Sequence, residues 1–168
     1  DDEFVADILE EMDSDDAVDI LEDMDNKDRE SVLSKMDEDA REDAEMILSY
    51  NEDQIGRIMT TNFIVINKED TIPVAMKKLV KQSGDNDNIS TIFVVDDDNK
   101  YIGAVDLKDL IKARKNAILA NICMENYPSV LASAIVSDVY QDVVDYGEDI
   151  IPVLDDSEHL IGALTAHD

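Results

Sequence analysis

The second part of the chain contains a long internal repeat, which restricts the possible folds more than any other sequence feature. The segment FVVDDDNKYIGAVDLKD (93–109) aligns with PVLDDSEHLIGALTAHD (152–168) at a constant offset of 59 residues. Each copy reads as an apolar strand, an acidic turn, and a second strand that contains glycine and leads into a polar helix start. The upstream segments 56–82 and 120–146 each pass from a methionine-containing turn through a short strand into an amphipathic helix. The repeat therefore predicts two β-α-β-β-α units that bury their sheet faces against each other.

A shorter repeat of 12 residues occupies the start of the chain. Its copies are DILEEMD (7–13), DILEDMD (19–25) and SVLSKMD (31–37). The apolar residues in each copy have the i, i+1, i+4 spacing of one helix face. The aspartate that ends each copy is well placed to cap the next helix, so Asp13 and Asp25 are expected to be N-caps. We expect short helices stacked around one core, with a fourth and longer helix over residues 40–50.

The distribution of charged residues also divides the chain into a first part and a second part. The whole chain has a formal net charge of −28, and residues 1–56 hold 23 acidic and 4 basic residues, whereas residues 57–168 hold 19 and 10. Such a balance argues against nucleic-acid binding and favours cations or a basic partner. The single cysteine, Cys123, fits a reducing compartment. With no basic, apolar leader and no apolar run of membrane-spanning length, the given sequence is expected to be cytoplasmic and soluble.

Catalysis finds no support in the sequence. His159 and His167 have no cysteine or serine partners at a useful spacing, and there is neither a P-loop nor a GxGxxG motif. We therefore expect a binding or regulatory protein rather than an enzyme.

The long repeat resembles a tandem pair of CBS domains. The resemblance rests on IMT (58–60), on VVD and IGAV in the first unit, and on PVLD and IGAL in the second. Placed after an acidic helical repeat and joined to it by YNEDQIGRIMT (50–60), this pair resembles the cytosolic region of the MgtE family of magnesium transporters and channels.

The resemblance implies a multi-domain architecture. Residues 1–54 would form an all-α right-handed superhelix of short helices, followed by an α/β tandem pair with the first CBS domain at 55–116 and the second at 117–168. It also implies a homodimer formed through the CBS domains and, in the intact protein, a transmembrane pore domain that this chain lacks. The location implied is the cytoplasmic face of the cell membrane.

The paired acids near the start of the chain suggest a metal site. Asp15 and Asp19 are four residues apart and therefore share one helix face. In the family that the chain resembles, two acids at this position face the last residue of a T-x-x-D motif across a metal, which here implies one interdomain Mg²⁺ site formed by Asp15, Asp19 and Asp168. The alternative is that these acids bind no ligand and are simply stabilised by the helix dipole, which favours negative charge in the first turn. This explains Asp15 and Asp16 better than Asp19.

A second group of acids is a weaker candidate for metal binding. Asp145, Glu148 and Asp149 lie where the family has further ligands, although Gly147 stands where an aspartate is common. Taken singly, each of these acids is better explained as solvated surface.

A nucleotide is the other candidate ligand. In CBS pairs, the Ser/Thr and Asp of [S/T]-x-x-D typically hold ribose and phosphate groups, and Thr165 and Asp168 match this motif. The first unit has Asp106 in place of Ser/Thr, followed by Lys108 and Asp109. An aspartate beside a phosphate is unfavourable, but Lys108 could offset it and Asp109 could bond a ribose hydroxyl.

Three functional hypotheses follow. The first is a Mg²⁺-sensing regulatory module that closes when Mg²⁺ binds between the helical and CBS domains and thereby gates an MgtE-type transporter or channel. The second is a CBS protein that senses an adenine nucleotide such as ATP and uses its acidic domain to dock another protein. The third treats the acidity as an adaptation to solubility or high salt, with no specific site.

Overall fold

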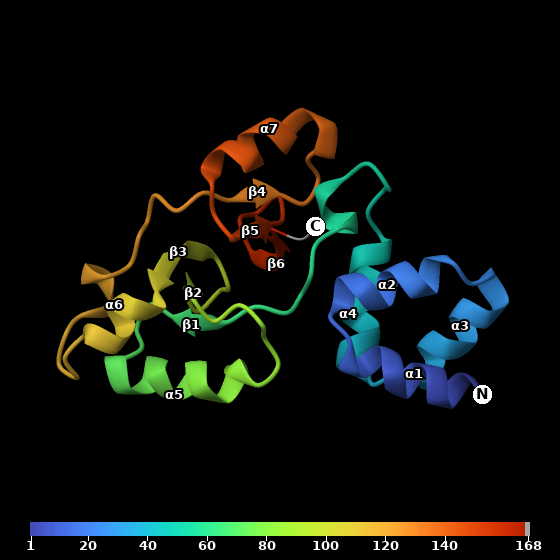
Figure 1. Cartoon of the computed structure of the whole chain (residues 1–168), viewed down its shortest axis with the longest axis horizontal. Helices are drawn as coiled ribbons and strands as arrows, with labels where there is room; N and C mark the ends of the chain where they lie inside the picture. The colour runs from blue at the N-terminus through green and yellow to red at the C-terminus, as the bar shows by residue number, and fades with distance from the viewer. Residues whose placement is uncertain (167–168) are drawn as a thin grey trace.

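A computed structural model describes residues 1–166, and its first part is a helical domain. Four helices follow one another along the chain: α1 (Asp2–Glu11), α2 (Ser14–Glu22), α3 (Asn26–Lys35) and α4 (Glu38–Leu48). Helix α1 packs on α3, and α2 packs on α4. Figure 1 shows these helices gathered on one side of the molecule, away from the sheets. The expectation of a helical domain ahead of an α/β pair is confirmed.

The 12-residue repeat explains the core of this domain. In the first two copies the leucine points inward and the isoleucine before it stays exposed, because a narrow helix face can bury only part of the apolar set. Leu9 and Leu21 are at most 2% exposed. The third copy differs, because Val32 is 1% exposed while Leu33, which aligns with the two leucines, is only partly buried.

A side-chain cap hydrogen bond forms at only one of the two aspartates expected to cap helices. Asp25 caps α3, because its Oδ1 accepts a hydrogen bond from the backbone N–H of Asp28 at 2.9 Å. Asp13 occupies the N-cap position of α2 as expected, but its side chain makes no cap hydrogen bond. The side chain of Asn62, 48 residues away, accepts from the N–H of Ser14 at 2.9 Å instead.

Two small mixed sheets form the rest of the molecule. The first unit contains β1 (Val65–Asn67), α5 (Ile72–Ser83), β2 (Thr91–Val95), β3 (Tyr101–Asp106) and α6 (Leu107–Lys112). The second contains β4 (Val130–Leu131), α7 (Val136–Tyr146), β5 (Ile150–Leu154) and β6 (Leu160–Thr165). In both sheets the first pair of strands is parallel and the second antiparallel.

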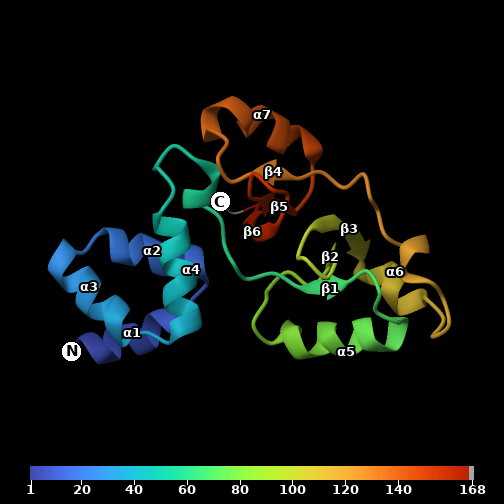
Figure 2. The same ribbon diagram turned by 180° about the vertical axis from the view of Figure 1, so that it is seen from behind.

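The register of the sheets reproduces the repeat. Val94 lies opposite Gly103 in the first sheet, and Val153 lies opposite Gly162 in the second, which is the predicted offset of 59 residues. The sheets face each other with α5 and α7 on the outer sides, as Figures 1 and 2 show. Phe93, Tyr127 and Ile150 are among the residues buried between them. No helix within residues 1–166 is long and apolar enough to cross a membrane.

Each unit sends its leading segment across to the other unit's sheet. After the short 3₁₀ helix η1 (Ile55–Arg57), Thr60 exchanges two backbone hydrogen bonds of 2.8 Å with Ala163 of β6. After η2 (Leu119–Asn121), Met124 pairs in the same way with Ala104 of β3. The two units therefore interlock instead of merely touching.

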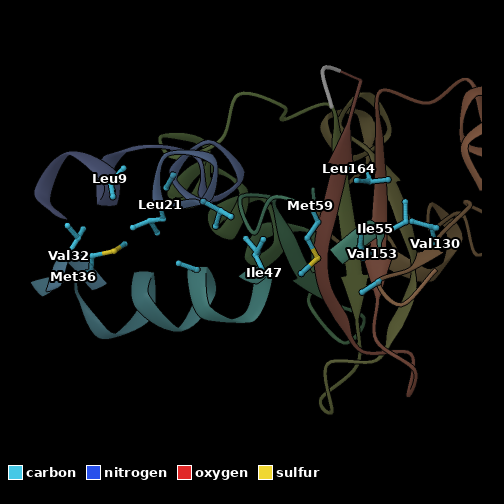
Figure 3. Close-up of a cluster of buried hydrophobic side chains, with 14 of the residues drawn as sticks. Leu9, Leu21, Val32, Met36, Ile47, Ile55, Met59, Val130, Val153 and Leu164 are labelled. Carbon is cyan, nitrogen blue, oxygen red and sulfur yellow. The ribbon is translucent and has the colours of Figure 1, made fainter. Parts of the chain in front are cut away.

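One hydrophobic core runs from the helical domain into the second unit. Figure 3 shows it passing from Leu21 through Ile47 to Met59 and on to Val153. The segment that carries it across, residues 50–62, is called the junction below. Because Ile47 and Met59 have no exposed surface, the helical domain packs directly on the junction.

Candidate metal and ligand site

The start of α2 is held against the junction by hydrogen bonds. The N–H of Thr61 donates to Ser14 Oγ at 2.6 Å, and the Thr61 hydroxyl lies 2.9 Å from the same oxygen. The Thr61 hydroxyl also donates to Asp43 Oδ2 at 3.1 Å. Together with the bond from Ser14 N–H to Asn62, these contacts place the first turn of α2 beside the C-terminal end of β6, where Thr60 pairs.

Asp43 is the acid of this network with a shifted pKa. Partial burial is the largest cause and raises its pKa, the bond from Thr61 opposes the rise, and the charge of Asp39 adds to it. The carboxylate is therefore held in a site that is unfavourable for its charge, with a hydroxyl donor as partial compensation.

An ion pair forms the second attachment of the helical domain. Arg57 Nε lies 2.5 Å from Glu22 Oε1, and Arg57 Nη1 donates to the carbonyl oxygen of Tyr50 at 2.8 Å. The two charged side chains are 16% and 30% exposed, so solvent screens this pair less than a surface pair.

Three carboxylates meet at the start of α2. Oxygen atoms of Asp13, Asp15 and Asp16 lie within 4.8 Å of one another, and this is a grouping that could hold a metal ion. Mg²⁺ prefers oxygen ligands, keeps several waters and is usually held by few carboxylates. Like charges this close repel one another, so a bound cation would relieve the repulsion.

A cavity opens beside this cluster, where all three parts of the molecule meet. Its volume is about 420 Å³. The helical domain and junction contribute Asp13, Thr60 and Asn62, the loop before β2 contributes Asp87, Asn88 and Ser90, and the second unit contributes Asp149, Ile150, Thr165 and Ala166. This space is called the acidic cavity below. Its described lining has three carboxylates and no basic residue, which suits a cation and disfavours a phosphate.

A second acidic space adjoins the first. It measures about 650 Å³ and lies between the end of α1, with Glu10 and Glu11, and the loop after α5, with Asp85 and Asp87. Asp13, Asn62 and Asp87 line both spaces, so the two form one acidic region along the helical domain.

The expected metal ligands are placed as follows. Asp15 belongs to the carboxylate cluster and is half-buried, whereas Asp19 lies one turn further along α2 on an exposed position. Asp168 lies outside the described residues. Asp149 lines the acidic cavity, Glu148 lines an apolar groove beside α7, and Asp145 accepts a hydrogen bond from Gln141 within α7.

Gly147 has a structural role at the end of α7. It ends α7 with φ +66°, a left-handed conformation that glycine adopts at little cost. Gly147 therefore shapes the turn that leads to Asp149.

The expected nucleotide residues fall into two separate places. Asp106 caps α6 by accepting from the N–H of Lys108 at 2.9 Å, and Asp106, Lys108 and Asp109 are all exposed. Thr165 ends β6 in the other sheet and lines the acidic cavity. Four of the 14 basic residues of the chain lie near Asp106, at Lys108, Lys112, Arg114 and Lys115.

Sequence reasoning missed the groups that assemble this region. Asp13 was expected only to cap a helix, and the polar triplet Thr60 to Asn62 had no assigned role. A polar run directly after the IMT motif was the available signal, but neither repeat places it opposite Ser14.

Comparisons with known protein families match two parts of the chain. Residues 1–53 match the MgtE intracellular N domain, and residues 55–116 match the CBS domain. The magnesium transporter MgtE of Enterococcus faecalis is 33% identical over 126 residues, which is 75% of this chain. The chain spans 28% of the length of that curated relative.

Solved structures agree over nearly the whole chain. The structure of the soluble part of a magnesium transporter matches this chain with a TM-score of 0.92 at 32% identity. The match covers 99% of this chain and 65% of the chain in that structure. The cytosolic domain of the Mg²⁺ channel MgtE in complex with ATP has a TM-score of 0.89 at 26% identity, over 97% of this chain and 67% of its own.

Proposed function

Because the chain belongs to the MgtE family as a cytosolic regulatory region, we propose that it senses Mg²⁺ and gates an MgtE-type magnesium transporter or channel. The observation that carries the proposal is the acidic cavity, where carboxylates from the helical domain and both CBS units face one space. A cation bound there attracts all three parts at once. Removing it leaves Asp13, Asp87 and Asp149 to repel one another across the cavity.

The ligand set is proposed residue by residue. Asp15 and Asp19 on α2 and Asp168 from the end of the chain form the expected interdomain site, and Asp13 and Asp16 extend it. Asp145, Glu148 and Asp149 form the weaker second set; of these, Asp149 lines the acidic cavity.

Closure is the proposed signal. Without Mg²⁺ the helical domain and the CBS units separate more readily, and with Mg²⁺ they hold together. A ligand shifts such an equilibrium only by its differential affinity for the two states, so several weak sites acting together give the steeper response. In the intact protein the closed form would act on the transmembrane pore domain from the cytoplasmic face of the membrane and hold the pore shut.

A titration of the purified chain tests this proposal. Millimolar MgCl₂ is expected to lower the radius of gyration in small-angle X-ray scattering and to slow tryptic cleavage. The double variant Asp15→Asn with Asp19→Asn should require more Mg²⁺ for the same effect. The matched control is Asp28→Asn with Glu30→Gln, which removes the same charge from exposed positions on α3.

Two results would refute the sensing role. One is a wild-type chain whose compactness and proteolysis do not change with Mg²⁺. The other is an equal loss of response in the α3 control, which would make the effect one of total charge, as the solubility hypothesis requires.

We also propose domain limits and an assembly. The sequence units are residues 1–54, 55–116 and 117–168, with the leading segments of the last two crossing between sheets. The CBS units are proposed to form a homodimer, because Ile111 in α6 and Ile118 after that helix are 63% and 65% exposed. Light scattering of the wild type and of Ile111→Asp would test the proposed homodimer. A monomeric wild type would contradict it.

Adenine-nucleotide sensing is the second candidate, and the basic segment at α6 favours it. Lys108 and its basic neighbours could meet the phosphates of ATP, with Asp109 toward the ribose, whereas Thr165 lies in a cavity of like charge to phosphate. Calorimetry with ATP and AMP should give binding that Lys108→Ala weakens and the exposed control Lys77→Ala does not. Absence of heat with either nucleotide would remove this candidate.

A further inference from the structure

Four residues join the helical domain to the junction by direct hydrogen bonds between protein groups. They are Ser14, Asp43, Thr61 and Asn62, called the clasp below. Ser14 donates its N–H to Asn62 at 2.9 Å and accepts from the N–H of Thr61 at 2.6 Å. The Thr61 hydroxyl reaches both Ser14 Oγ at 2.9 Å and Asp43 Oδ2 at 3.1 Å.

The clasp replaces an ordinary helix cap. A residue that precedes a helix usually satisfies the free N–H groups of its first turn, but the Asp13 side chain makes no such bond. Asn62 supplies the acceptor from outside the helical domain. One free N–H of the first turn of α2, that of Ser14, therefore meets this acceptor only when the helix sits on the junction.

The junction is in turn fixed to the second CBS unit. Ile55 donates to the carbonyl of Ala134 at 2.9 Å, Gly56 donates to that of Ala132 at 2.9 Å, and Thr60 pairs with Ala163. Thr60 is 3% exposed and lies next to Thr61 in the chain. The clasp thus ties the start of α2 to the same body that carries Asp149.

We propose that the clasp is a positioning device that docks the acidic start of α2 over the acidic cavity before a cation binds. This inference rests on the proposed Mg²⁺-sensing function and assigns it a regulatory element outside the metal ligands. Ligand binding to a site that is formed only part of the time is weakened by the fraction of time it is formed. The clasp therefore determines how much Mg²⁺ is needed to keep the domains together.

Two variants in the whole 168-residue chain test the proposal. Thr61→Val removes the hydroxyl while keeping the shape of the side chain, and Ser14→Ala removes the other hydroxyl. Neither residue lines the acidic cavity as described, so both variants leave its lining intact. Trypsin reports separation of the domains, because the bond after Arg57 lies in the junction and Arg57 is held by Glu22.

In EDTA, both variants should be cleaved after Arg57 roughly 5- to 30-fold faster than wild type, as loss of one or two part-buried hydrogen bonds implies. The MgCl₂ concentration that restores the wild-type cleavage rate should be correspondingly high. Thr61→Ser retains the hydroxyl and should behave as wild type. Ser34→Ala, which removes an exposed hydroxyl bonded within α3, should do the same.

The outcomes are separable. Wild-type cleavage rates for Thr61→Val and Ser14→Ala in EDTA would overturn the clasp, whatever Mg²⁺ does. Faster cleavage of both with no rescue by Thr61→Ser would assign the effect to packing and also overturn it. A wild type insensitive to Mg²⁺ would refute the proposed function and the link to cation demand, while the EDTA comparison would still decide whether the clasp holds the domains.

Discussion

The crossing of the junction over β6 depends on the absence of a side chain at Gly162. A Cβ placed there would overlap Met59 Sδ and lie 2.9 Å from Met59 Cγ and 3.1 Å from the carbonyl oxygen of Thr60. Met59 has no exposed surface, so its side chain has little room to move. The substitution Gly162→Ala must therefore push the junction away from the sheet.

The expected cost is that of an overpacked core. One additional methyl group in a filled site costs about 1–3 kcal/mol. For a chain of this length each kcal/mol lowers Tm by about 2–4 °C, so Gly162→Ala should melt about 2–12 °C below wild type. Urea unfolding followed by circular dichroism gives the free energy, and calorimetry gives Tm.

Two other glycines provide controls. Gly103 holds the equivalent place in the first sheet, where a Cβ would lie 2.5 Å from the carbonyl oxygen of Met124, so Gly103→Ala should cost a similar amount. Gly84 has an ordinary φ of −66° and no atom within 4 Å of an added Cβ, so Gly84→Ala should stabilise the chain by about 0.4–1 kcal/mol. If Gly162→Ala unfolds at the same urea concentration as wild type, the close crossing of Met59 over β6 is not present in solution.

Two further substitutions test single polar contacts. Tyr127→Phe removes a buried hydroxyl that donates to the carbonyl of Ile150 at 2.6 Å, and should cost about 1 kcal/mol in urea unfolding; no loss would mean that water replaces the contact. The stability of Asp43→Asn relative to wild type should increase as the pH rises from 4 to 7. Burial raises the pKa of Asp43 above its ordinary 3.8, so the folded state binds the proton more tightly than the unfolded state does. As the pH rises through the raised pKa, Asp43 ionises in the folded protein and the protein loses stability. Asparagine does not ionise, so the variant keeps its stability. A stability difference that shrinks toward pH 7 would contradict this reasoning.

Local sequence patterns were sufficient for the secondary elements and the strand register. The 12-residue spacing placed Leu9 and Leu21 on buried helix faces, because helical periodicity depends only on near neighbours. In the third copy the fully buried residue is Val32, one position earlier than the repeat gives. The offset of 59 residues likewise matched the pairing of Val94 with Gly103 and of Val153 with Gly162, since similar segments make similar hairpins. The same patterns put Asp15 and Asp19 on one helix.

The assembly of these elements depended on contacts between residues far apart in the chain. Asn62 caps the helix that Asp13 precedes, Thr60 pairs with Ala163, and Asp149 lines the same cavity as Asp13. Periodicity carries no information about such pairs, because they arise when packing of the core brings separate segments together. The acidic stretch at the start of α2 is thus visible in the sequence as charge, whereas the surfaces it faces are set by the crossing of the junction over the second sheet.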